Sequence, residues 1–158
     1  MSDQTMARRF EPFVTVPELG QKERESTMAS ILLVEDDDQL RSMVKELLRR
    51  SGHEVSEAPD GRRVCEMHQQ QHFDLVITDL VMPDIDGLAV IMELRLIDQN
   101  VRIIAMSGQR QGRAKEYLRI AQKLGAQHTL VKPFGNQEFL EAVGLALETT
   151  KAHLCPDC

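Results

Sequence analysis

The sequence predicts an α/β fold, a doubly wound sheet of five parallel strands with helices on both faces. Three observations support this prediction. Short apolar runs alternate with segments of helical periodicity five times along the chain. The runs at 31–34, 75–78 and 101–106 are apolar on both faces, as strands covered on both sides must be. The chain has 158 residues, 42% apolar and 28% charged, which suits one folded domain.

The first half of the chain carries two strand–helix units. The run at 31–34 predicts a buried strand, and the apolar residues after it recur at helical spacing until Ser51-Gly52 ends the helix. These helical positions are Leu40, Met43, Val44, Leu47 and Leu48. A weaker strand is expected at 54–58, followed by a mostly polar helix at 62–71. The inward contacts expected for that helix are Val64, Cys65 and Met67.

The second half repeats the alternation three times. Strands are expected at 75–78, 101–106 and 129–131. Helices are expected at 88–94, 117–124 and 139–147, where apolar residues again lie at helical spacing. Ligands of doubly wound sheets bind at the carboxyl ends of the strands, where the strand order reverses. The residues just beyond each strand are therefore the candidates for chemistry.

The folded domain is expected at 29–150, between an N-terminal extension at 1–28 and a C-terminal tail at 151–158. The first 27 residues mix Pro, Gly and scattered charges without a sustained period of 2 or 3.6. Met28 stands two residues before the first strand, so we expect a chain that begins at Met28 to fold. Cys155 and Cys158 have Cys-x-x-Cys spacing, but a single such pair is more typical of a tail than of a metal site.

Composition argues against several classes of protein. The net charge of −6 and the pI near 5.4 disfavour direct binding to nucleic acid. No apolar run approaches 18 residues, and no basic segment followed by an apolar core opens the chain, so neither a membrane span nor a secretory signal is expected. Three cysteines form no disulfide framework, which favours the cytoplasm. Solvent-facing or helix-end positions are expected for His53, His68, His72 and His128.

The acidic run 35–38 follows the first strand directly, and it has two interpretations. Aspartates before a helix accept hydrogen bonds from its free N–H groups, a role we expect for Asp38 and also for Asp37. Four consecutive carboxylates exceed what capping needs, however, because two charges about 4 Å apart repel by roughly 4 kcal/mol at an effective ε of 20. A hard cation such as Mg²⁺ would relieve that repulsion.

Three further groups lie at the ends of later strands, and each also has an ordinary interpretation. Asp79 could be a turn residue, Ser107 a helix cap and Lys132 a surface lysine. The run before Asp79 delivers it rigidly to the edge of the sheet, and Met82-Pro83 stiffens the loop beyond. A carboxylate held beside a cation is positioned to attack phosphorus in line. Lys132 and Ser107 could then bind two oxygens of the phosphoryl group.

Four motifs in order, ILLVEDDDQLR, DLVITDLVMPDIDG, IIAMSG and LVKPF, each stand at a strand end. Together they resemble the bacterial two-component response-regulator receiver domain in its stand-alone form, as in the single-domain chemotaxis regulators. The resemblance spans roughly residues 30–147 and makes 29–150 the receiver domain. It implies a flavodoxin-like sheet with strand order 2-1-3-4-5.

The resemblance also implies the residues of an Mg²⁺ site. Asp79 matches the phospho-acceptor, and Glu35 and Asp36 match the acid pair, with the register fixed by Arg41 five residues after Asp36. Asp36 and Asp79 are the implied direct metal ligands together with the backbone carbonyl of Val81. Glu35 is expected to act through water.

Further positions in the resemblance concern switching. Ser107 matches the hydroxyl that moves toward the phosphoryl group, Lys132 the phosphate-binding lysine, and Pro133 the proline whose preceding bond is often cis. Thr129 occupies the switch position where the family often has an aromatic residue, which puts an aromatic in-and-out switch in doubt. The apolar Val81, paired with Gln109 in facing the phosphoryl group, predicts slow self-dephosphorylation.

The function implied is a phospho-acceptor switch that receives its phosphoryl group from a histidine kinase or a histidine phosphotransfer protein. Output would pass to a downstream protein that the sequence does not name, or through a homodimer, and no metabolite would be turned over. Two alternatives remain. A phosphatase of the haloacid-dehalogenase type needs a second Asp two residues after the nucleophile, where Val81 stands. A receiver-like domain that binds no phosphate should lack Asp36, Asp79 or Lys132, and all three are present.

Overall fold

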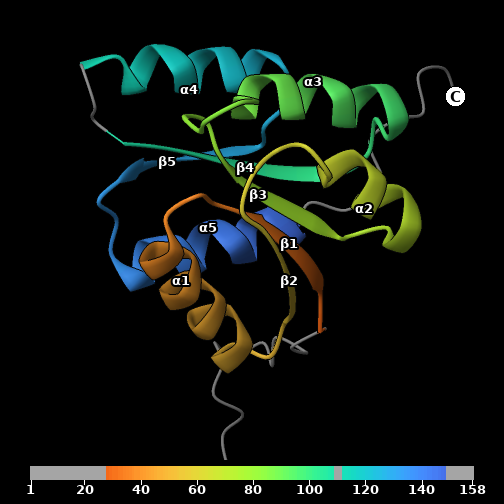
Figure 1. The fold of residues 1–158 in the computed structure, drawn as a ribbon. Coiled ribbons are helices and arrows are strands. Elements are labelled where there is room, and N and C mark those ends of the chain that lie inside the picture. Colours follow the sequence, from red (N-terminus) through yellow and green to blue (C-terminus); the bar gives the residue numbers. More distant parts are fainter. Residues whose placement is uncertain (1–27, 109–111, 149–158) are drawn as a thin grey trace, which may run out of the picture.

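The computed structural model describes residues 28–108 and 112–148, which form a five-stranded sheet between two layers of helices (Figure 1). The strands are hydrogen-bonded in the order β2-β1-β3-β4-β5, and every pairing is parallel. Their bounds are β1 Ser30–Val34, β2 Glu54–Ala58, β3 Leu75–Asp79, β4 Arg102–Gly108 and β5 His128–Lys132. The predicted fold class and strand order are confirmed.

Five helices connect and cover the strands within these described ranges. They are α1 Asp38–Arg50, α2 Val64–Gln71, α3 Gly87–Ile97, α4 Ala114–Lys123 and α5 Asn136–Glu148. The second helix begins two residues later than predicted, because the backbone N–H and the guanidinium of Arg62 bind the carboxylate of Asp60 in a turn (2.9 and 3.1 Å). Strand β4 extends two residues further than predicted, because Ser107 and Gly108 still pair with β5.

Each face of the sheet has its own apolar core, because successive residues of a strand point to opposite faces. Leu32 and Val34 of β1 pack with side chains of α2, α3 and α4, whereas Ile31 and Leu33 pack with side chains of α1 and α5. The strands β1, β3 and β4 are almost entirely buried. This explains why their sequences are apolar without alternation.

Several predictions fall outside the described residues. These are the N-terminal extension as far as residue 27, the tail at 151–158 with Cys155 and Cys158, and the position of Gln109. The predicted domain boundaries therefore remain predictions. Among the helices that the structure describes, none has the length and apolar character needed to cross a bilayer.

Candidate functional site

The strand order brings the predicted site residues to one edge of the sheet. Strands β1 and β3 are neighbours with Val34 opposite Thr78, so Glu35 and Asp79, one residue further on, lie side by side. Carboxylate oxygens of Glu35, Asp36 and Asp79 all lie within 4.8 Å of one another. Strand β5, which lies two strands beyond β3 in the same sheet, ends at Lys132. Residues separated by almost a hundred positions in sequence thus meet.

Lys132 joins two of these carboxylates. Its Nζ atom lies 2.6 Å from Oε2 of Glu35 and 3.0 Å from Oδ2 of Asp79. The Glu35 and Asp79 side chains are 1% and 6% exposed, and that of Lys132 is 18% exposed. When all are ionised, three carboxylates and one ammonium leave a net charge of −2. Hard oxygen donors with this residual charge suit a divalent cation such as Mg²⁺.

The pKa values of Glu35 and Lys132 are both raised in this site. Burial, together with the nearby charge of Asp79, raises the pKa of Glu35 to about 7, against the opposing effect of Lys132. Burial lowers the pKa of Lys132, but its hydrogen bonds and charge interactions with Glu35 and Asp79 outweigh burial, so its pKa is raised. The lysine therefore stays charged, and Glu35 retains part of its proton near neutral pH.

The loop from β1 to α1 is held by its own carboxylates, in a way that corrects one prediction. Asp37, not Asp38, is the N-cap of α1, because its Oδ1 accepts the backbone N–H groups of Gln39 and Leu40 (2.9 and 3.1 Å). The N–H of Asp37 in turn donates to Oε1 of Glu35 (3.1 Å). Asp38 begins the helix and pairs with Arg41.

The loop after β3 holds Asp79 from the other side. The backbone N–H of Val81 donates to Oδ1 of Asp79 at 3.2 Å, while the Val81 side chain is 46% exposed. Gly87, at the start of α3, donates its N–H to the carbonyl of Leu80, and any Cβ at that position would overlap the Asp79 carbonyl. Only glycine lets α3 begin this close to Asp79.

The remaining predicted positions occupy β4 and β5. Ser107 is fully buried at the end of β4, and its hydroxyl lies 3.5 Å from the Gly108 carbonyl. Thr129 is half-buried, and its hydroxyl oxygen lies 3.4 Å from the Gln122 side-chain nitrogen on α4. The Lys132–Pro133 peptide bond is cis, as expected from the sequence.

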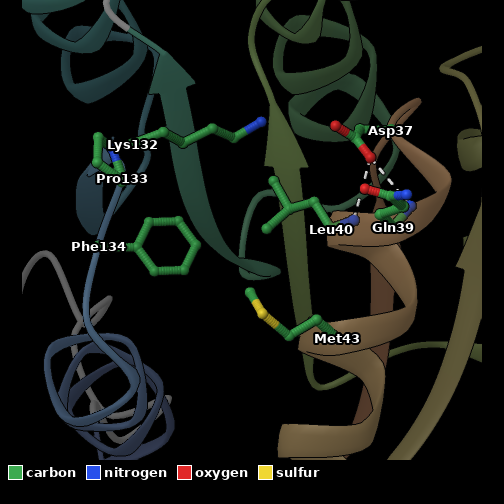
Figure 2. A pocket seen from close by; sticks show the side chains of 7 residues that line it. All are labelled: Asp37, Gln39, Leu40, Met43, Lys132, Pro133 and Phe134. Atoms are coloured by element: carbon green, nitrogen blue, oxygen red, sulfur yellow. Dashed lines mark hydrogen bonds between the residues drawn. The ribbon is translucent and has the colours of Figure 1, made fainter.

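An open groove beside this site was not predicted from the sequence. The groove has a volume of about 670 Å³ and lies between α1 and the segment after β5. Figure 2 shows Leu40 and Met43 of α1 on one side and the Phe134 ring on the other, with the Lys132 side chain at its upper end. Asp37, Gln39 and Pro133 complete the lining. Met43, predicted as an apolar helix position, is 52% exposed here.

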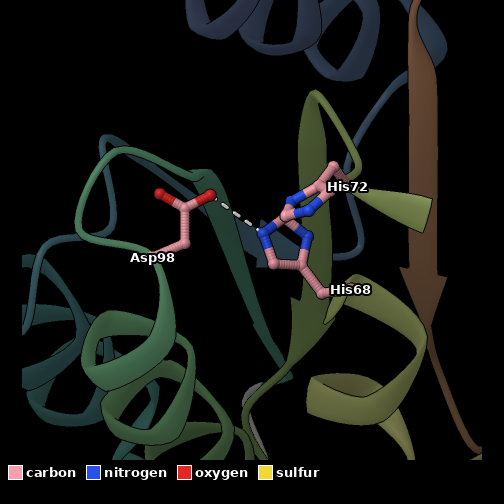
Figure 3. A group of neighbouring side chains, drawn as sticks. All are labelled: His68, His72 and Asp98. Carbon is pink, nitrogen blue, oxygen red and sulfur yellow. Dashed lines mark hydrogen bonds and ion pairs between the residues drawn. The ribbon is translucent and has the colours of Figure 1, made fainter. Parts of the chain in front are cut away.

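A second cluster, His68, His72 and Asp98, lies where α2 and α3 end and the chain leads into the amino ends of β3 and β4 (Figure 3). His68 lies in the last turn of α2, which agrees with the predicted helix-end position, but the solvent-facing alternative is wrong because its side chain is only 1% exposed. Its Nδ1 accepts the backbone N–H of Phe73 (3.2 Å), so Nε2 carries the proton that is donated to Asp98 (2.9 Å). Both ring nitrogens are thereby used, which disfavours metal binding at this cluster and indicates a structural role.

The chain is similar to proteins of known family. A family model described as the response regulator receiver domain matches residues 31–144. The chemotaxis protein CheY of Bacillus subtilis is 36% identical over 118 residues, which are 74% of this chain and 96% of that protein. Sporulation initiation phosphotransferase F of the same species is 27% identical over 113 residues, or 72% of this chain and 89% of that protein.

A solved structure gives a comparison in three dimensions. The response regulator protein TrrA from Thermotoga maritima, crystallised in complex with Mg²⁺ and BeF, is 30% identical to this chain with a TM-score of 0.67. The match covers 76% of this chain and 100% of that one.

Proposed function

Because this chain belongs to the response regulator receiver domains, the phospho-acceptor switches of two-component signalling, we propose that Asp79 is its phosphorylation site. One observation carries this assignment. Asp79 is a nearly buried carboxylate that lies beside two other acids and within 3.0 Å of the Lys132 ammonium. A carboxylate in such a setting is fixed in direction and surrounded by groups that stabilise an incoming phosphoryl charge.

The cation site is assigned to Glu35, Asp36, Asp79 and the backbone carbonyl of Val81. The carboxylate oxygens fit Mg²⁺ because they are hard donors, and because two carboxylates with several sites left for water are typical of its sites. When bound, Mg²⁺ neutralises charge on the transferring phosphoryl group. Glu35, which is buried and bound to Lys132, is assigned an indirect role through water.

In the proposed transfer, one oxygen of Asp79 forms a bond to phosphorus while the P–N bond of the donor's phosphohistidine breaks. The electron pair of that bond returns to the imidazole nitrogen. The Val81 N–H restrains Asp79, and Lys132 supplies a cation for one phosphoryl oxygen. We assign the Ser107 hydroxyl to a second oxygen, which would draw the end of β4 toward the site after phosphorylation.

The phosphohistidine donor, a histidine kinase or a histidine phosphotransfer protein, is proposed to dock at the groove beside Lys132. A donor must bring its histidine to the strand ends, and the groove offers Leu40, Met43 and Phe134 there as apolar contacts. In the phosphorylated state, the added charge of roughly −1.5 to −2 would favour movement of the end of β4 toward Asp79. Thr129, bound to Gln122 of α4, takes the switch position without an aromatic ring.

Receiver domains are signalling domains, and we propose that this one turns over no metabolite and acts in the cytoplasm by contact with another protein or with a second copy. The phosphatase alternative is disfavoured because Val81 supplies no general acid at the position where that chemistry needs one.

The test of this function is incubation of the full chain with acetyl phosphate and Mg²⁺, followed by intact-mass measurement. The wild type should gain the mass of one phosphoryl group, and Asp79→Asn should gain none. Asp84→Asn is a matched control, because Asp84 lies in the same loop, is exposed, and has a backbone conformation that Asn also tolerates (φ 70°). A phosphoryl gain that persists in Asp79→Asn would reject the assignment.

The docking proposal has its own test. Met43→Asp should slow transfer from a phosphorylated kinase at least tenfold, because it places a charge in the apolar groove. Phosphorylation by acetyl phosphate should remain within about twofold of the wild type, because a small donor does not use the groove. Equal slowing with both donors would argue against docking at this surface.

A further inference from the structure

Arg41 of α1 binds groups on and around the acidic loop at 35–38. Its side chain is 16% exposed, and each arm of its guanidinium has a different acceptor. Nη1 donates to the backbone carbonyl of Glu35 (2.8 Å), Nη2 to the Asp38 carboxylate (2.5 Å), and Nε lies 3.5 Å from Glu57 of β2. One side chain therefore joins the loop, the first turn of α1 and a neighbouring strand.

The peptide groups around Glu35 are fixed on both sides by this arrangement. The N–H of Glu35 donates to the carbonyl of Ala58 at the end of β2 (3.2 Å), and its carbonyl accepts from Arg41. Glu57 is itself held by the Lys45 ammonium at 2.5 Å, which keeps the carboxylate in place for Arg41. The chain just beyond β1 is thus anchored to β2 through main chain and side chain together.

Asp36 depends on this anchor more than its neighbours do. The Glu35 carboxylate is held by Lys132 and by the Asp37 N–H, and the Asp79 carboxylate by Lys132 and by the Val81 N–H. In the described part of the chain, no hydrogen bond or ion pair holds the exposed Asp36 side chain. The position of the Asp36 side chain is therefore set by the backbone alone. The peptide group between Glu35 and Asp36 is the one whose carbonyl Arg41 binds.

We propose that Arg41 is a positioning residue that orients Asp36 for the cation. The inference rests on the proposed function, because it requires the acidic loop to be the metal site. Groups that orient metal ligands from behind typically change metal affinity by 10- to 100-fold when they are replaced. Lysine cannot substitute here, because its single nitrogen cannot serve three acceptors in three directions.

The experiment measures Mg²⁺ binding by isothermal titration calorimetry with the full chain. Arg41→Gln and Arg41→Lys should each weaken binding at least tenfold. Arg50→Gln is the matched control, because Arg50 lies on the same helix but its side chain is 77% exposed and pairs with the exposed Glu46. A second variant, Glu57→Gln, leaves Arg41 in place and weakens its anchor, so a smaller loss of about two- to fivefold is expected.

Two readouts separate positioning from a general structural role. In metal-free protein, the amide ¹⁵N signal of Asp36 should shift in Arg41→Gln and not in Arg50→Gln, because that nitrogen is conjugated with the Glu35 carbonyl. The Mg²⁺ concentration needed for half-maximal phosphorylation by acetyl phosphate should rise at least tenfold in Arg41→Gln. The maximal rate at saturating Mg²⁺ should stay within about threefold of the wild type.

The outcomes distinguish this inference from the proposed function. If the wild type binds Mg²⁺ and is phosphorylated but both Arg41 variants bind Mg²⁺ as tightly, the positioning role is overturned and the proposed function stands. The role is also overturned if the maximal rate collapses while Mg²⁺ affinity is unchanged. A wild type that neither binds Mg²⁺ nor accepts a phosphoryl group would overturn both.

Discussion

Replacing Lys132 by methionine removes the cation that separates two buried carboxylates. In metal-free protein, Glu35 and Asp79 would then face each other with carboxylate oxygens within 4.8 Å. At an effective ε of 20, two charges at that distance repel by about 3.5 kcal/mol. Because Glu35 is largely ionised only above pH 7, we expect Lys132→Met to lower the free energy of unfolding of the metal-free protein by about 2 kcal/mol at pH 8.5.

Protonation limits this loss and makes it depend on pH. The pKa of Glu35 is already about 7 in the folded wild type, and holding the carboxyl fully protonated costs about 1.4 kcal/mol for each pH unit above that value. At pH 8.5 the interval is roughly 1.5 units and the limit is about 2 kcal/mol. At pH 7 the wild-type Glu35 is already half protonated, and the loss should shrink to less than about 0.5 kcal/mol.

The assay is urea unfolding followed by far-ultraviolet circular dichroism, with a chelator present, at pH 8.5 and at pH 7. A loss of about 2 kcal/mol corresponds to a fall in Tm of roughly 7 °C for a folded domain of this size. Lys45→Met is the matched control, since Lys45 forms an equally short ion pair whose side chains are 26% and 30% exposed. It should cost less than about 1 kcal/mol at either pH.

Two results would contradict this prediction. Lys132→Met could prove as stable as the wild type at pH 8.5, in which case the carboxylates do not repel across a buried gap. Alternatively, the loss could be the same at both pH values, which would mean that Glu35 does not take up the proton. Addition of Mg²⁺ should recover part of the lost stability, because the cation relieves the same repulsion.

Four further predictions follow from the same geometry. Because the pKa of Glu35 rises from 4.5 to about 7 on folding, its protonated form favours the folded state, and metal-free stability should fall as the pH rises from about 4.5 to 7. For the same reason, Mg²⁺ binding should release protons below pH 7, which calorimetry in buffers of different ionisation enthalpy would detect. Asp37→Ala should cost about 1 kcal/mol in urea unfolding, because α1 loses its N-cap, and an unchanged midpoint would contradict that role. Val81→Asn should shorten the lifetime of the phosphorylated protein measured by intact mass, because an amide can orient water where Val81 cannot. An unchanged or longer lifetime would reject the shielding role.

Hydrophobic periodicity and the residues at strand ends predicted much of the fold and most residues of the candidate site. The apolar runs before Glu35 and Asp79 specified buried strands, and the rule that ligands bind beyond strand ends selected the residues that now lie together. Helix ends were less certain. A run of acids offers several equivalent candidates for the N-cap. Asp37 accepts the free N–H groups because its backbone is still extended, whereas Asp38 is already the first residue of the helix.

Other features could not be read from residue types. His68 has a polar side chain and is nevertheless buried. Its two ring nitrogens are hydrogen-bonded, one to Asp98, thirty residues later in the chain, and one to the N–H of Phe73. The groove beside Lys132 depends on how α1 packs relative to the segment after β5. Such contacts depend on distances between elements, which periodicity does not encode.

Hydrophobic period and turn chemistry are local properties, so the amino-acid sequence specifies which residues lie near the carboxyl ends of the strands in a parallel sheet. The position of Lys132 between Glu35 and Asp79, and the hydrogen bond from Arg41 to the peptide before Asp36, follow only from the folded arrangement. Both results depend on which strands are neighbours and on their register. Charges a few ångströms apart in a buried site set pKa values and metal affinity, and that separation exists only once the chain has folded.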